Sequence, residues 1–148
     1  MKIEDEIKQS QFASVEQKAI INVVYTANKI NQIIISKLKS FDLNLTQYNV
    51  LRILNGRKDS FATCGEIKEV MLDKSPDVTR ISNKLLEKKL INRIVNPENK
   101  REVHLSISKK GVKLLEIINP TIAEKMLNFS KLSNGELELL SNLLDKVR

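Results

Sequence analysis

Apolar residues follow helical spacing over a long stretch near the start of the chain, from Ala13 to Leu38. They recur three or four positions apart, as residues on one face of an amphipathic helix do. The stripe consists of Ala19, Ile20, Val23, Val24, Ala27, Ile30, Ile34 and Leu38. We expect this stretch to form a single long helix.

Two shorter helices are predicted after it. The pattern breaks over residues 41–45, after which Thr46 suits an N-cap and an apolar stripe leads to Gly56. Thr63 and Glu66 then have the spacing of a capping box, in which each side chain satisfies a backbone amide at the start of a third helix.

A fourth helix is predicted to begin at Ser75. This residue suits an N-cap, Pro76 suits the first helical position, and Asp77 complements the positive end of the helix. The inward face would hold Val78, Ile81, Ser82, Leu85 and Lys89. The outward face would hold Pro76, Arg80, Asn83, Lys84 and Glu87. The inward face is expected to pack on a core, which leaves the outward face available for contact.

The pattern then changes to that of a β-hairpin. Residues 90–95 and 101–107 are strand candidates separated by a polar turn, and the second alternates apolar with polar side chains. Ser108 would cap a further helix, which Pro120 either restarts or kinks, and a last helix follows Ser133.

These elements predict a mainly α fold with a small β-hairpin wing, in which the hairpin follows a helix-turn-helix. The chain has 148 residues, 41% of them hydrophobic, and this suits one domain spanning 1–148. The winged helix-turn-helix would occupy 41–110, between helical parts at 1–40 and 111–148.

Positive charge is concentrated in the helix-turn-helix and hairpin. Residues 74–110 hold ten Lys or Arg against four Asp or Glu, whereas the whole chain carries a formal charge of +7. A charged helix face alone is usually a solvated surface, and an anionic membrane or plain solubility would also account for a basic chain. The coincidence of charge and motif favours duplex DNA as the partner.

The start of the fourth helix is expected to lie in the major groove and to read base edges. The candidates are Asp77, Thr79, Arg80, Asn83 and Lys84. Arg suits the guanine edge and Asn suits adenine, while Lys serves a base or a phosphate. Lys74 and Ser75 would contact the DNA backbone. The hairpin tip would place Asn99, Lys100 and Arg101 beside the duplex, with Arg101 preferred for the minor groove.

The sequence disfavours other functions. It has no Gly-rich phosphate loop and no Ser, His and acid set at a catalytic spacing, so an enzyme is not expected. A single-stranded nucleic acid binder would interleave aromatic and basic residues, but no Phe, Tyr or Trp occurs between Phe61 and Phe129. The remaining rival is a winged helix used for protein interaction, since a fold does not fix a function. Steep weakening by salt would distinguish DNA binding from it.

No metal or cofactor site is expected. One cysteine, Cys64, and one histidine, His104, cannot build the usual zinc site, and His104 would lie on the outward face of its strand. Cys64 would lie in the first turn of the third helix, where the helix dipole favours the reactive thiolate form of a cysteine. A buried structural thiol is the simpler interpretation. Tyr25 and Tyr48 could line an effector pocket, but such residues are more often at the edge of a core. We assign no ligand site.

The first eight residues are too acidic and too broken by charge for a secretory signal, and no apolar stretch approaches the ~18 residues of a membrane span. We therefore expect a cytoplasmic protein without a membrane partner.

Several short motifs occur in order along the centre of the chain. They are Val78-Thr79-Arg80, Leu85-Leu86-Glu87-Lys88-Lys89-Leu90-Ile91, Asn96-Pro97-Glu98-Asn99-Lys100-Arg101 and Leu105-Ser106-Ile107-Ser108-Lys109-Lys110-Gly111. On these residues the segment from Ser75 to Gly111 resembles the core of the MarR family of winged-helix regulators. Leu45-Thr46-Gln47 with Val50-Leu51 is also similar to the family's second helix.

The resemblance implies an obligate homodimer that binds a palindromic operator, with residues 1–40 and 111–148 as the dimerisation part. Family members are commonly repressors released by small phenolic ligands or by oxidation of a cysteine in the first helix, where this chain has none. The sequence departs from the family pattern twice. Asn99 stands where family wings often have an Asp that pairs with the wing Arg. Many relatives also have a Gly between the fourth helix and the first strand of the hairpin, where this chain has Lys88-Lys89-Leu90.

Overall fold

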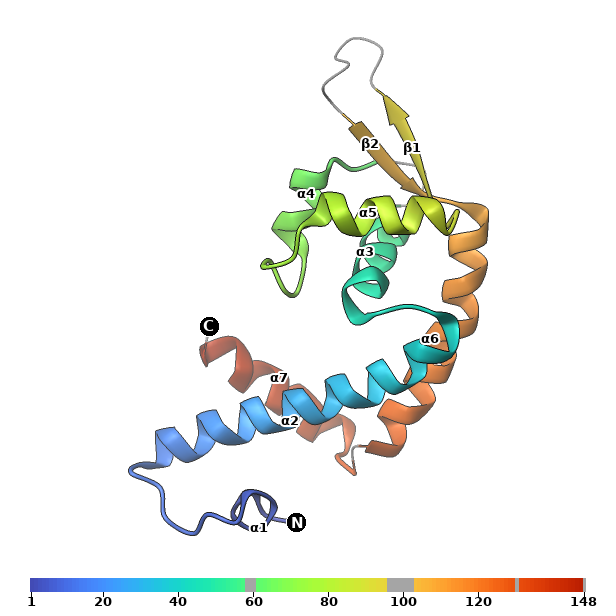
Figure 1. Cartoon of the computed structure of the whole chain (residues 1–148). Helices are drawn as coiled ribbons and strands as arrows, with labels where there is room; N and C mark the ends of the chain where they lie inside the picture. Colours follow the sequence, from blue (N-terminus) through green and yellow to red (C-terminus); the bar gives the residue numbers. More distant parts are fainter. Residues whose placement is uncertain (58–60, 96–102, 130, 148) are drawn as a thin grey trace.

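A computed structural model describes residues 1–57, 61–95, 103–129 and 131–147. The elements are α1 (Ile3–Ile7), α2 (Val15–Leu38), η1 (Lys39–Phe41), α3 (Leu45–Gly56), α4 (Cys64–Val70), α5 (Val78–Glu87), β1 (Ile91–Val95), β2 (Val103–Ile107), α6 (Lys109–Phe129) and α7 (Asn134–Val147). The hairpin lies at one end of the molecule, and α6 runs from it toward α2 and α7 at the other (Figure 1). The predicted mainly α fold with a β-hairpin is confirmed. Among the described residues, no helix has the length and apolar character needed to cross a bilayer.

The long helix predicted near the start of the chain is α2, which Ser14 caps by accepting a hydrogen bond from the Gln17 N–H. The short helix α1 was not predicted from the sequence. This short helix buries Ile3, and its Glu4 and Glu6 side chains pair with Lys18 and with Tyr25 of α2. It is therefore held to α2 by charge-assisted hydrogen bonds from Lys18 and Tyr25, and Lys29 of α2 adds an ion pair to Glu6 at 3.6 Å.

The cap of α3 differs from the prediction. Asn44, and not Thr46, is the N-cap, because its side chain accepts from the Gln47 N–H at 2.8 Å while the Gln47 side chain accepts from the Asn44 N–H at 3.1 Å. This reciprocal pair satisfies two amides, which a lone Thr46 hydroxyl would not do.

The cap of α5 differs in the same way. The Asp77 carboxylate accepts from the N–H groups of Thr79 and Arg80 at 2.9 and 3.3 Å, so the helix begins at Val78. Ser75, the predicted cap, instead donates its hydroxyl to the Asp73 carboxylate at 2.6 Å. The prediction failed because several polar residues in succession can each cap locally, and the backbone geometry selects among them.

The core of the winged helix-turn-helix lies among α3, α4, α5 and the hairpin. Its fully buried side chains include Leu51, Leu54, Ile67, Leu85 and Leu105. β1 and β2 pair antiparallel, with Ile91 opposite Ile107 and Val95 opposite Val103. Ala62 adds an isolated bridge to β2, exchanging two backbone hydrogen bonds with Leu105 at 2.9 and 2.8 Å. This third segment was not predicted, because a single bridging residue has no alternation to detect.

The end of α5 is closed by a Schellman motif. The Leu90 N–H donates to the Leu85 carbonyl at 3.0 Å and the Lys89 N–H donates to the Leu86 carbonyl at 2.8 Å. Lys89 has a φ of 59°, the left-handed conformation that the motif usually assigns to glycine. The prediction that Lys89 lies on the inward face was therefore wrong, since it stands beyond the helix with its side chain exposed.

The start of α6 is fixed directly against this helix end. Ser108 donates its N–H to the Leu90 carbonyl at 3.0 Å and its hydroxyl to the Lys89 carbonyl at 2.8 Å, and its oxygen accepts from the Gly111 N–H at 3.0 Å. A Cβ at Gly111 would overlap the Leu90 carbonyl oxygen and lie 2.8 Å from Cγ1 of Ile107. Only glycine allows this approach, and α6 then continues through Pro120 to Phe129. We call this contact the α5–α6 joint.

Replacement of Gly111 by Ala should lower the free energy of unfolding by about 2 kcal/mol, because an added methyl must push the joint apart. Urea denaturation monitored by circular dichroism measures the change. Gly135→Ala is the matched control, since no atom lies within 4 Å of its added Cβ; it should be neutral or slightly stabilising. Equal stability of the two variants would contradict the proposed tightness of the joint.

Candidate nucleic-acid interface

The outward face of α5 is polar and available. Val78, Ile81, Ser82 and Leu85 are buried, whereas Thr79, Arg80, Asn83 and Lys84 are exposed. Within the described part of the chain, the side chains of the latter four have no hydrogen bond or ion pair. The predicted division of the helix into a packed and a free face is thus confirmed, apart from Lys89 and from Pro76, which precedes α5 and is half-buried.

Some of the other charged residues in this region have partners within the protein. The Lys88 ammonium group binds the carboxylate of Asp42 at 2.8 Å and also its backbone carbonyl, and this lowers the pKa of the Asp42 carboxyl. Lys110 donates to the Lys88 carbonyl at 2.9 Å. Asp77 caps α5. These side chains hold the local structure, and their charges add to the field without being free to reach a ligand.

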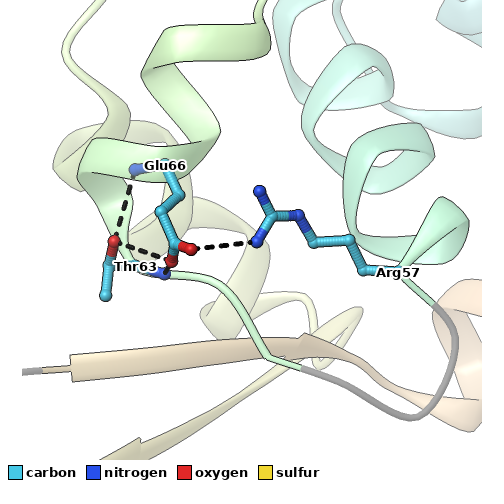
Figure 2. Close-up of polar contacts among 3 residues, drawn as sticks. All are labelled: Arg57, Thr63 and Glu66. Carbon is cyan, nitrogen blue, oxygen red and sulfur yellow. Dashed lines mark hydrogen bonds and ion pairs between the residues drawn. The ribbon is translucent and has the colours of Figure 1, made fainter.

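The helix before α5 is held by its own capping box, which the sequence predicted correctly. Thr63 donates its N–H and hydroxyl to the Glu66 carboxylate at 2.8 and 3.0 Å, and Arg57, the C-cap residue of α3, binds the other Glu66 oxygen at 3.2 Å (Figure 2). The bonds from Thr63, together with Arg57, hold the pKa of the Glu66 carboxyl below its ordinary value. In addition, the Leu72 N–H donates to the Asn49 side chain at 3.2 Å, which ties the turn after α4 to α3.

The base of the hairpin is close to α5, and its tip is not part of the described structure. Arg93 of β1 is exposed and lies opposite Leu105 in the register. The His104 ring is half-buried because Phe61 stacks on it at a centroid distance of 3.9 Å. The predicted wing residues Asn99, Lys100 and Arg101 lie outside the described residues, whereas Lys74 and Ser75 are exposed in the turn before α5.

A cleft of about 370 Å³ separates α4, α5 and the hairpin. It is lined by Thr63, Cys64, Gly65, Thr79, Ser82, Asn83, Leu86, Arg93, Val103 and Leu105. Cys64 is half-buried in its wall. Ser82 is 3% exposed, and its hydroxyl oxygen has no partner among the described residues. Ser82 was predicted only to lie on the packed face of α5, and no sequence signal marks its hydroxyl as unpaired.

The two tyrosines do not meet in one pocket. Tyr48 is buried at the contact of α3 and α6, where its hydroxyl donates to the Asn119 side chain at 2.8 Å, and burial raises its pKa above the ordinary value. Tyr25 lies on α2 and donates to Glu6 of α1 at 2.5 Å. Tyr48 is therefore a residue of the core edge that joins the two parts of the chain. No group of three His, Cys, Asp or Glu residues in the described segments could hold a metal ion.

Comparisons with known proteins agree with this architecture. A family model described as MarR family matches residues 43–103. The HTH-type transcriptional regulator MhqR of Bacillus subtilis (strain 168) is 31% identical over 106 residues, which cover 71% of this chain and 72% of that protein. The chain belongs to the MarR family. Membership places it among transcription regulators and not among enzymes.

Solved structures of MarR proteins share the fold. The crystal structure of the S. aureus MepR–DNA complex has a TM-score of 0.75 and 25% identity, covering 84% of this chain and 92% of that chain. A MarR transcription factor from Planctomyces limnophilus has a TM-score of 0.67 and 28% identity, covering 91% and 98% respectively. The MarR assignment expected from the motifs between Ser75 and Gly111 is thereby confirmed.

The cap assignment at α5 can be tested by stability. Asp77→Ala should lower the free energy of unfolding by about 1 kcal/mol, because two N–H groups of the first turn lose their acceptor. Ser75→Ala is the matched control and should change it by less than about 0.5 kcal/mol, as an exposed substitution outside the cap. A larger loss for Ser75→Ala than for Asp77→Ala in chemical denaturation would restore the originally predicted cap.

Proposed function

We propose that this MarR-family protein is a homodimeric repressor that binds a palindromic operator in duplex DNA and is modulated by a small molecule. Each subunit would place α5 in a major groove, with half-site centres ~10 bp apart, one turn of the duplex. Arg80, Asn83, Lys84 and Thr79 would read base edges, and Lys74 and Ser75 would contact the backbone. Asn99, Lys100 and Arg101 would lie at the flanks, with Arg101 in the minor groove.

The observation that carries the proposal is the free polar face of α5. Side chains that read DNA must leave water and bind base edges, so a side chain already bonded within the protein would lose those bonds. Arg80, Asn83 and Lys84 are exposed without such bonds in the described part of the chain, whereas neighbouring Lys88 is bonded to Asp42. The similarity to MepR, whose structure was solved bound to DNA, supports DNA binding by this chain.

The capping role of Asp77 changes the interpretation of one predicted contact. Its carboxylate accepts two backbone N–H groups at the start of α5. A base contact would require it to leave these donors, and its charge repels phosphates. We therefore propose that Asp77 orients the first turn toward the groove, and that the base contacts belong to the residues after it.

Dimerisation is supported by apolar surface at the end of the molecule away from the hairpin. α7 buries none of its residues, and α2 buries only Leu38. Both helices expose large apolar side chains: Val15, Ile20, Val23, Val24 and Ile35 on α2, and Leu137, Leu139, Leu140, Leu143 and Val147 on α7. A second copy of the chain would remove this surface from water and place two α5 helices in one assembly.

A winged helix that binds another protein is the second candidate, and it is the weaker one. Protein interfaces favour aromatic and apolar anchors, whereas the exposed face of α5 offers Thr79, Arg80, Asn83 and Lys84. This composition suits a polyanion with polar base edges.

Replacing single side chains of α5 should separate base reading from charge. Arg80→Ala should weaken binding to a specific duplex by about 1 to 3 kcal/mol and relax base preference at one position. Lys84→Ala should reduce the salt dependence of binding, by about one unit of slope if it contacts a phosphate. Fluorescence anisotropy at several salt concentrations measures both effects on duplexes recovered from genomic DNA.

Lys125→Ala is the matched control. Like the two α5 variants it removes one positive charge, but from the exposed surface of α6, far along that helix from the α5–α6 joint. It should leave affinity and base preference unchanged. Equal weakening of specific and random duplexes by Arg80→Ala would refute a reading role for that residue.

A charge placed in the α7 stripe should separate the subunits. Leu140→Glu should convert the dimer to a monomer and abolish operator binding, because a buried carboxylate without a partner opposes association. Asn142→Glu introduces the same charge on the opposite face of α7 and should leave the dimer intact. Sedimentation velocity measures the mass, and a Leu140→Glu protein that remains dimeric would place the interface elsewhere.

A further inference from the structure

Helix α6 contains a weak turn in its interior. Pro120 lies inside the helix and has no N–H, so it gives no backbone hydrogen bond to the Glu116 carbonyl one turn earlier. The next side chain, Thr121, donates its hydroxyl to the Ile117 carbonyl at 3.0 Å, a kind of bond that often bends helices. Proline is also one of the few features that bend a helix sharply. The backbone of α6 therefore constrains its own direction weakly at this turn.

A tyrosine of the winged helix-turn-helix is bonded to this turn. The Tyr48 hydroxyl of α3 donates at 2.8 Å to the side-chain oxygen of Asn119, the residue directly before Pro120. The Tyr48 ring is buried, and the Arg52 guanidinium group lies 5.8 Å from its centroid. Because the ring is enclosed, its hydroxyl points in a fixed direction. We call this hydrogen bond the α3–α6 latch.

The apolar contacts around the latch supply a different kind of constraint. Leu115 and Ile118 before Pro120, and Ile122 after it, are buried in the same core cluster as Leu38 of α2. The hydrophobic effect is non-directional, so this burial holds α6 on the core without selecting one bend angle. A hydrogen bond weakens steeply when its angle changes. The latch therefore distinguishes between neighbouring bend angles that the apolar contacts accept.

We propose that Tyr48 and Asn119 are positioning residues, which fix the bend of α6 at Pro120 and thereby the spacing of the two α5 helices on DNA. Neither side chain contacts a base or a phosphate in this scheme. They act through α6 and the α5–α6 joint. The consequence for α5 rests on the proposed dimeric, DNA-binding function, whereas the bend of α6 is a property of each chain.

The length of α6 converts a small change of bend into a large displacement of α5. Gly111 of the joint lies about nine residues before Pro120, which is a lever of ~14 Å in a helix. A change of ~10°, half of a sharp proline kink, moves the joint by ~2.4 Å over this lever. Two subunits together give ~5 Å, which exceeds the ~3.4 Å rise of one base pair. Loss of the latch should therefore relax the half-site spacing that the dimer accepts.

The latch is tested by the distance between two spin labels, measured by pulsed electron paramagnetic resonance. Exposed positions take the labels, with Glu69→Cys on α4 and Glu124→Cys on α6 beyond Pro120, in a Cys64→Ser background. Dilution with unlabelled protein keeps the measured distance within one chain, whatever the oligomeric state. Tyr48→Phe should widen the distance distribution by ~2 Å or more, the displacement expected of the freed lever.

Tyr25→Phe is the matched control, because it removes the same hydroxyl from a bond to Glu6 of α1 and should leave the distribution unchanged. Circular dichroism checks that both variants fold. Adding Pro120→Ala to Tyr48→Phe should narrow the distribution again, since alanine restores the N–H that bonds to the Glu116 carbonyl. An unchanged distribution in Tyr48→Phe, equal widening in Tyr25→Phe, or widening that persists in the double variant would each overturn the proposal.

The consequence for DNA is tested on a palindromic duplex recovered from genomic DNA and resynthesised with its half-sites one base pair closer or farther apart. The wild type should prefer one spacing. Tyr48→Phe should lose about three- to tenfold of that preference, the worth of one hydrogen bond, and keep its base preference within each half-site. An equal spacing preference in both proteins would overturn the coupling to DNA. If the wild type binds no duplex, the proposed function fails by itself, and the label distances still decide whether the latch fixes α6.

Discussion

The close approach of Gly111 to the Leu90 carbonyl is the constraint on which the arrangement of the chain depends. Ser108 donates to the Lys89 and Leu90 carbonyls across the same contact and accepts from the Gly111 N–H, and the Schellman turn at Lys89 directs the chain into it. The α5–α6 joint therefore fixes the direction of α5 relative to α6. Because α6 runs toward α2 and α7 (Figure 1), the orientation of the polar helix face is set by the helices at the opposite end of the molecule. In a dimer the spacing of two α5 helices would follow from the same contact.

The basic side chains of the central segment have two different roles, and the net charge of the segment does not distinguish them. Lys88 neutralises Asp42, and Lys110 donates to the Lys88 carbonyl at the end of α5, so they stabilise the turn before α3 and the joint. Arg80 and Lys84 carry the same charge on the exposed face of the helix without partners in the described residues. A polyanion would sense the combined field, but only the second pair can contact it directly. This division is the physical basis for assigning recognition to a few residues of a broadly basic region.

The long-range pattern of the sequence predicted the helices after α1, the hairpin and the free face of α5, because helical and strand periodicities survive in the packed structure. Local choices were harder to predict. The caps at Asn44 and Asp77 were missed, because neighbouring polar side chains compete for the same amides. Lys89 was misplaced, because a non-glycine residue at a left-handed position carries no sequence mark. The bridge at Ala62 and the unpaired Ser82 hydroxyl depend on contacts between distant segments, and the wing-tip contacts of Arg101 stay a prediction.

The central claim is that the free face of α5 reads duplex DNA in a symmetric dimer. The most direct measurement is retention of genomic duplex fragments by the protein as salt is raised, with sequencing of the fragments that remain bound at the highest concentration. The account predicts a steep fall of affinity with salt and a shared palindromic motif whose half-site centres lie ~10 bp apart. Uniform weak retention without a common motif would contradict it and would favour a winged helix that binds protein.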